Sequence, residues 1–155
     1  MVELGFGLYF LVLFLMYLAL PQRWVRMKNL RITQKKMIDD VLLWCHQNYF
    51  PTPKNHKLQY KIHYYQHKKF DGLYCGISKT ITLYITPEKR VIDVIDTILH
   101  EYQHYMDIQN KKQVKLYSEV LTQVGYDKHP MEISARKFAK KHRVKCFENF
   151  QRKWF

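Results

Sequence analysis

The chain has 155 residues, enough for one domain with a single core, and it carries a formal net charge of +13 with 15% aromatic residues. Five glycines and five prolines, with no long Ser- or Gly-rich run, argue against a disordered or linker-rich protein. Three scattered cysteines give no even disulfide framework, so we expect a reducing compartment.

An uncharged apolar run occupies residues 4–20 and lies at the short end of what spans a bilayer. The start Met1-Val2-Glu3 lacks the positive charge of a cleaved signal peptide. We therefore predict a transmembrane anchor over residues 1–22, rather than a helix buried in the protein. The cations of a basic juxtamembrane segment, residues 23–32, then predict a single-pass membrane protein whose domain, residues 33–155, lies in the cytosol.

Three elements are predicted before residue 90. Apolar residues near helical spacing predict a helix over Thr33–Tyr49, with Thr33 as its cap. Strict alternation over Leu58–Tyr65 predicts a strand with one buried face. The β-branched run Thr80–Thr86 predicts another strand, and Gly72 and Gly76 precede it as residues typical of turns.

The next segment carries the most informative motif of the chain. Val91, Val94, Ile95, Ile98 and Tyr102 form the apolar stripe of a helix that contains His100-Glu101-Tyr102-Gln103-His104. A four-residue spacing places the two imidazoles on one face, about 6 Å apart along the axis. This arrangement is typical of two zinc ligands with Glu101 as a general base. The alternative is a pair of ordinary core histidines, which is disfavoured because burying three unpaired polar groups costs several kcal/mol.

A catalytic zinc usually has three protein ligands, and Glu119, His129 and Glu132 are the downstream candidates. Pro130 suits the first position of a helix, so Glu132 would project from its first turn. Ala135 and Ala139 on the same face would let this helix approach the histidine helix closely. We therefore predict Glu132 as the third ligand, with His129 as the second choice. Glu132 could instead be a first-turn acid that complements the helix dipole.

Two stretches of the chain resemble a known family. The sequence LHEYQHYMD at Leu99–Asp107, followed by HPMEISARKFA at His129–Ala139, resembles the small zincin-type metallopeptidases of the ImmA/IrrE and phage-associated group. In that group the glutamate of an E-x-x-A-x-x-F-A pattern completes the metal site, which implies Glu132 here. The resemblance implies an α+β, zincin-like fold in which a small mixed or antiparallel sheet packs on the active-site helix. The transmembrane helix predicted from the apolar run would precede this domain. It also implies an edge strand that pairs with an extended peptide, and we expect that edge at Ser78–Tyr84.

These observations predict a zinc metallopeptidase that hydrolyses a protein or peptide substrate. His100, His104 and Glu132 would hold Zn²⁺, Glu101 would move the proton, and Tyr126 or His129 would stabilise the oxyanion. Two other classes remain open. One is a catalytically inactive binding module stabilised by a metal with a fourth protein ligand. The other is a DNA-associated protease of the SprT-like type.

The high charge suits anionic lipid headgroups or nucleic acid. The basic tract with interleaved aromatic residues lies near the C-terminus: Lys140, Lys141, Arg143, Lys145, Phe147, Phe150, Arg152, Lys153, Trp154 and Phe155. Its aromatic residues could stack on bases. We favour the alternative of a solvated helix face whose aromatic side chains turn to the core or a lipid interface.

Overall fold

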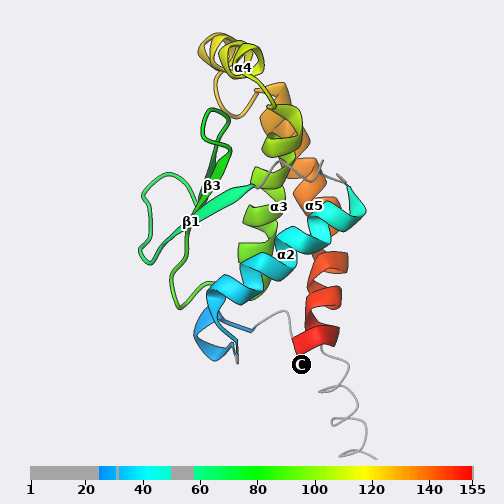
Figure 1. Cartoon of the computed structure of the whole chain (residues 1–155). Coiled ribbons are helices and arrows are strands. Elements are labelled where there is room, and N and C mark those ends of the chain that lie inside the picture. The colour runs from blue at the N-terminus through cyan, green and yellow to red at the C-terminus, as the bar shows by residue number, and fades with distance from the viewer. Residues whose placement is uncertain (1–24, 31, 50–57, 155) are drawn as a thin grey trace, which may run out of the picture.

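The computed structural model describes residues 25–30, 32–49 and 58–154, and within them the chain is α+β with a small mixed sheet. The elements are the 3-10 turn η1 (Met27–Asn29), helix α2 (Gln34–Asn48), strands β1 (Gln59–His63), β2 (Gly72–Cys75) and β3 (Thr80–Tyr84), and helices α3 (Val91–Asp107), α4 (Lys111–Val124) and α5 (Pro130–Trp154). Figure 1 shows α3 in the middle, with the sheet to one side of it, α5 to the other and α4 at one end. The predicted α+β class and small sheet agree with this arrangement.

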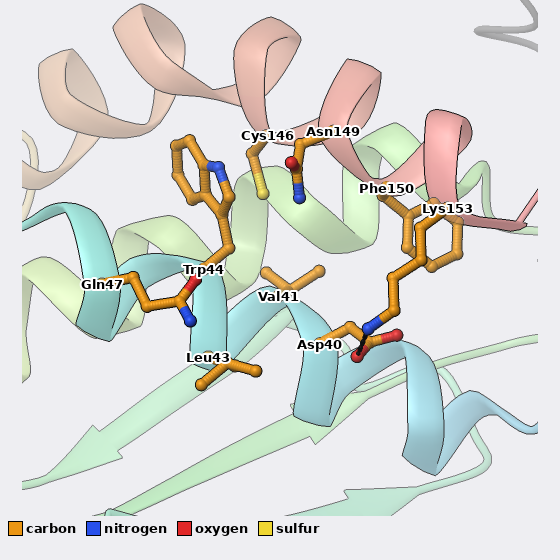
Figure 2. A pocket seen from close by; sticks show the side chains of 9 residues that line it. All are labelled: Asp40, Val41, Leu43, Trp44, Gln47, Cys146, Asn149, Phe150 and Lys153. Atoms are coloured by element: carbon orange, nitrogen blue, oxygen red, sulfur yellow. Dashed lines mark hydrogen bonds and ion pairs between the residues drawn. The ribbon is translucent and has the colours of Figure 1, made fainter.

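Helix α2 begins where the sequence predicts. Thr33 caps it by accepting a hydrogen bond from the backbone N–H of Lys36 at 3.2 Å. Its buried face packs against α3 and α5. Figure 2 shows residues that line a hollow between α2 and α5, where the ammonium of Lys153 lies 2.6 Å from a carboxylate oxygen of Asp40. The last turn of α5 is thereby attached to α2.

The sheet has the strand order β1-β3-β2, with β1 parallel and β2 antiparallel to β3. The expectation of an edge strand at Ser78–Tyr84 is therefore wrong, because β3 lies in the middle. Thr80, Ile81 and Leu83 are buried, as is usual for a strand with neighbours on both sides. The edge next to α3 is β2, a four-residue strand that the sequence did not predict.

The predicted transmembrane helix requires a correction. Among residues 25–30, 32–49 and 58–154, no helix is both long enough and apolar enough to cross a membrane. The longest described helix, α5, carries charged residues along its whole length, and α3 contains four acidic residues. The apolar run at residues 4–20 lies outside the described residues. The described part of the chain is therefore an α+β domain in which no helix spans a membrane, and the membrane and cytosolic location stays a prediction.

The folded domain begins before residue 33. The backbone N–H of Met27 donates to the carbonyl of Lys89 at 2.8 Å, and the N–H of Val91 donates to the carbonyl of Val25 at 2.8 Å. Met27 is buried in the core. Residues 25–30 of the predicted juxtamembrane segment are therefore attached to the start of α3.

Candidate metal centre

Helix α3 presents its histidines on the face opposite its apolar stripe. The stripe predicted from the sequence is fully inside the core: Val91, Val94, Ile95, Ile98 and Tyr102. His100 and His104 point the other way, towards the first turn of α5. The helix is anchored by a broad buried face, so the histidine positions are fixed by its packing.

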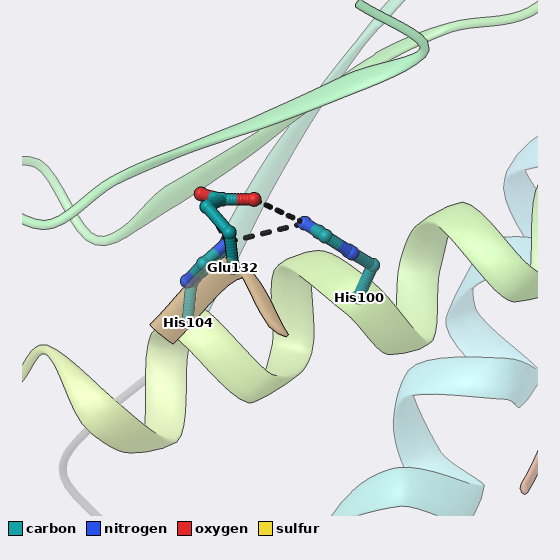
Figure 3. A group of neighbouring side chains, drawn as sticks. All are labelled: His100, His104 and Glu132. Atoms are coloured by element: carbon teal, nitrogen blue, oxygen red, sulfur yellow. Dashed lines mark hydrogen bonds and ion pairs between the residues drawn. The ribbon is translucent and has the colours of Figure 1, made fainter. Parts of the chain in front are cut away.

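His100, His104 and Glu132 form a compact cluster, which Figure 3 shows with their polar atoms converging. The Nε2 atoms of the two histidines lie 3.2 Å apart. His100 Nε2 lies 3.2 Å from Oε2 of Glu132, and His104 Nε2 lies 3.1 Å from Oε1. One donor atom from each residue lies within 4.8 Å of the other two, so the group could hold a metal ion.

Glu132 reaches the histidines because α5 packs closely on α3. The helix starts at Pro130, which places Glu132 in its first turn. Ala135 and Ala139, one and two turns on, are completely buried. Small side chains at these two positions let the axes approach, as the sequence predicted.

The electrostatics of the cluster favour a positive charge at its centre. Burial alone would raise the pKa of Glu132, but hydrogen bonds from His100, His104 and Tyr117 outweigh it and hold the pKa well below its usual range. Burial likewise disfavours the charged form of His104, yet the hydrogen bond with Glu132 and the charge of Glu101 raise its pKa. A cation at the centre would meet a carboxylate that stays ionised.

Glu101 lies beside the cluster and outside it. Its side chain is buried, and this burial raises the pKa of its carboxyl, although the charges of His100 and His104 oppose the shift. The backbone N–H of Tyr74 on β2 donates to it. Gly72 makes this approach possible, because a Cβ there would lie 2.9 Å from Cγ of Glu101 and 2.6 Å from Cγ2 of Thr97. Strand β2 therefore runs directly along the carboxylate.

Tyr117 on α4 is a site residue that the sequence analysis missed. Its hydroxyl donates to Oε1 of Glu132 at 2.5 Å, and its ring lies 5.9 Å from the ring of His104. The hydroxyl therefore helps to fix the orientation of the carboxylate. The available sequence signal was the apolar stripe of α4, which includes Tyr117, but the spacing does not reveal what its hydroxyl contacts.

The other two candidates for the third ligand have different roles. Nδ1 of His129 accepts from the N–H of Met131 at 3.1 Å, so Nε2 carries the proton and donates to the carbonyl of Tyr117 at 3.2 Å. His129 thus joins α4 to the start of α5, and both of its ring nitrogens are used in these backbone contacts. Glu119 is exposed on α4 and lies 3.7 Å from Lys115.

Tyr126, the second predicted oxyanion stabiliser, does lie at the site. It is 46% exposed and lines the same cavity as His100, Glu101 and Glu132. Burial, a hydrogen bond with Glu132 and the nearby acidic charges raise the pKa of its phenol, so it stays protonated and able to donate.

The aromatic residues of the C-terminal tract are largely used within the fold. Phe147 and Phe150 are buried, and Nε1 of Trp154 donates to Asp40 at 2.6 Å. The two phenylalanines therefore have no free face for stacking on bases. This agrees with the alternative in which the aromatic side chains turn to the core.

Comparisons with models of protein families, with curated proteins and with solved structures found no significant match to this chain. The likeness to zincin-type metallopeptidases remains a prediction that rests on the two sequence motifs.

Proposed function

We propose that this chain is a zinc-dependent metallopeptidase that hydrolyses peptide bonds of a protein substrate. The observation that carries the proposal is the mutual separation of 3.1–3.2 Å among two imidazole nitrogens and one carboxylate. Zn–N bonds of about 2.0–2.1 Å in tetrahedral geometry separate neighbouring donors by about 3.3 Å. Two histidines and one carboxylate are also a donor set that zinc prefers in catalytic sites.

Zinc bound there would lower the pKa of a coordinated water towards about 7 and polarise the substrate carbonyl. Glu101 is the proton carrier of the proposal. It is buried next to the cluster, whose contacts join His100, His104 and Glu132 to one another and leave Glu101 beside the group. Its raised pKa favours taking a proton from water and passing it to the leaving amine.

Two further groups support the chemistry. Tyr117 holds Glu132 in place through its hydroxyl, which leaves the histidines and the carboxylate preorganised. Tyr126 keeps a phenol proton at the cavity wall, where it can donate to the carbonyl oxygen of the substrate as negative charge develops.

The test compares Glu101→Gln with wild type on a library of peptides derived from a digested proteome. We expect Glu101→Gln to bind zinc like wild type and to lose hydrolysis by a factor of about 10² to 10⁴, because only the proton carrier is removed. Glu119→Gln, at an exposed carboxylate on α4, is the matched control and keeps full activity.

His104→Ala separates metal binding from proton transfer, because it removes a zinc ligand and should lose both zinc and hydrolysis. Equal hydrolysis by wild type and Glu101→Gln contradicts the proposed mechanism. Stoichiometric zinc without hydrolysis of any library peptide supports the metal-stabilised binding module instead.

A further inference from the structure

Two hollows with different linings meet at the cluster of His100, His104 and Glu132, here called the metal-ligand cluster. The larger, of about 230 Å³, lies beneath α4, and the smaller, of about 170 Å³, lies along the middle of α3. Both include His100, Glu101 and Gly72 in their walls. A chain lying along β2 would therefore have one hollow on each side of the reacting bond.

One wall of the larger hollow is the apolar stripe of α4. Val114, Tyr117 and Leu121 line it from positions i, i+3 and i+7, so they share one helix face. Helix α4 has no buried residue, although its sequence is clearly amphipathic. Its apolar face is thus directed at a cavity that the rest of the described chain leaves unfilled.

The facing wall is apolar as well. Phe70, just before β2, and Leu73, within it, are 39% and 49% exposed, although both line the hollow. Tyr74 and Ile108 complete the lining from β2 and the end of α3. Apart from the cluster, Glu101 and the hydroxyls of the lining tyrosines, the hollow is therefore bounded mostly by carbon.

The position of α4 that creates this hollow is defined by specific contacts. Gly76 lets the helix approach the sheet, because a Cβ there would lie 2.8 Å from Cγ2 of Val114. Asn110 and Gln113 form a reciprocal capping box at its start. Tyr117 joins it to Glu132. These contacts set the position of α4 and therefore the shape of the hollow next to the cluster.

The residues that line only the smaller hollow are polar. Lys69, Asp71, Asp96 and Thr97 contribute to it. Asp71 is paired with Lys89, and Asp96 lies 3.4 Å from Arg143. The two sides of the cluster thus present opposite chemistry to a bound chain.

We infer that the larger hollow is a specificity pocket that receives a large apolar side chain, of the leucine, methionine or phenylalanine class, from the residue next to the cleaved bond. A charged side chain would lose its water there without gaining a partner. The polar hollow accommodates a polar residue on the other side of the bond. This inference rests on the proposed function, because it assigns the substrate class of the same site.

Its test measures binding rather than turnover. The probes are three peptide hydroxamates that differ only in the side chain next to the hydroxamate: isobutyl, hydrogen or carboxymethyl. With the zinc-loaded full chain we expect the isobutyl compound to bind about ten- to a hundredfold tighter than the hydrogen compound, from the apolar area it buries. The carboxymethyl compound should bind no tighter than the hydrogen compound.

Two substitutions connect this preference to the pocket. Leu121→Trp fills the hollow from α4 and should remove the isobutyl advantage, whereas Leu116→Trp, at a 50% exposed position outside the lining, should keep it. Leu73→Asp changes the opposite wall at an exposed position and should reduce the advantage independently of α4.

Equal binding of the three hydroxamates, binding of none of them, or an unchanged preference in both Leu121→Trp and Leu73→Asp overturns the inference. The outcome is separable from that of the proposed function. A clear isobutyl preference without peptide hydrolysis keeps the pocket and contradicts the peptidase. Hydrolysis without any side-chain preference supports the peptidase and contradicts the pocket.

Discussion

Two regions border the cluster of His100, His104 and Glu132. One is the interface between α3 and α5, the other is helix α4, and different forces hold them in place. Helices α3 and α5 share a buried interface that includes Ala135 and Ala139, and both contribute residues to the group that could hold a metal ion. Helix α4 has no buried residue and is attached through the contacts of Tyr117 with Glu132 and with His129. Apolar packing thus fixes the ligands, while a few polar contacts hold the wall of the pocket.

The difference separates the parts of the site that must stay rigid from those that can vary. Donors that move by a fraction of an ångström bind a metal poorly, so it is useful that they lie on packed helices. A pocket wall with few buried contacts can change its side chains at little cost to stability. We therefore expect substitutions in the two regions to have very different effects.

The largest expected effect is on stability. Ile98→Ala removes a fully buried side chain of α3 and should lower the free energy of unfolding by about 2–5 kcal/mol. Leu121→Ala on α4 should lower it by about 1 kcal/mol or less, because Leu121 is only half-buried. Urea denaturation of the metal-free chain measures both. Equal losses would remove the distinction between the two regions.

A second pair of substitutions places a methyl group against each region. Gly72→Ala crowds Thr97 and Glu101 of α3, which cannot move away, and should cost about 1–3 kcal/mol. Gly76→Ala crowds Val114 of α4 and Ile108, and should cost less because α4 can shift. Thermal and urea unfolding of the two variants compare them directly. A larger loss for Gly76→Ala would mean that α4 is as firmly fixed as α3.

The smallest effect concerns the polar connection between the regions. Tyr117→Phe removes the hydroxyl that orients Glu132 and should weaken zinc binding by a factor of about 10 to 100, with little change in stability. Chelator competition measures the affinity. Tyr64→Phe, at a 67% exposed tyrosine far from the ligand set in the sequence, is the control for loss of a phenol. Unchanged affinity in Tyr117→Phe would show that α4 does not support the metal ligands.

The local parts of this architecture could be predicted from the sequence. The four-residue spacing of His100 and His104 is set by one helix, and Pro130 with Ala135 indicated how Glu132 would approach them. The Thr33 cap is equally local. In each case the signal lies within a few residues of its consequence.

The non-local parts could not be predicted. Strand order depends on pairing between distant segments, so the edge was expected at Ser78–Tyr84 although it lies at Gly72–Cys75. Gly72 was interpreted only as a turn residue before the strand at Thr80–Thr86, whereas it lets β2 pass close to Glu101. The contact of Tyr117 with Glu132 depends on how α4 folds back over the cluster, which no periodicity encodes.

The central claim is that His100, His104 and Glu132 hold zinc with a place left for water. X-ray absorption at the zinc edge of the zinc-loaded full chain tests it most directly. We expect one zinc per chain, bound by two imidazoles with oxygen in the remaining positions, and one imidazole fewer in His104→Ala. A sulfur ligand, a third imidazole, or no bound zinc would contradict the claim.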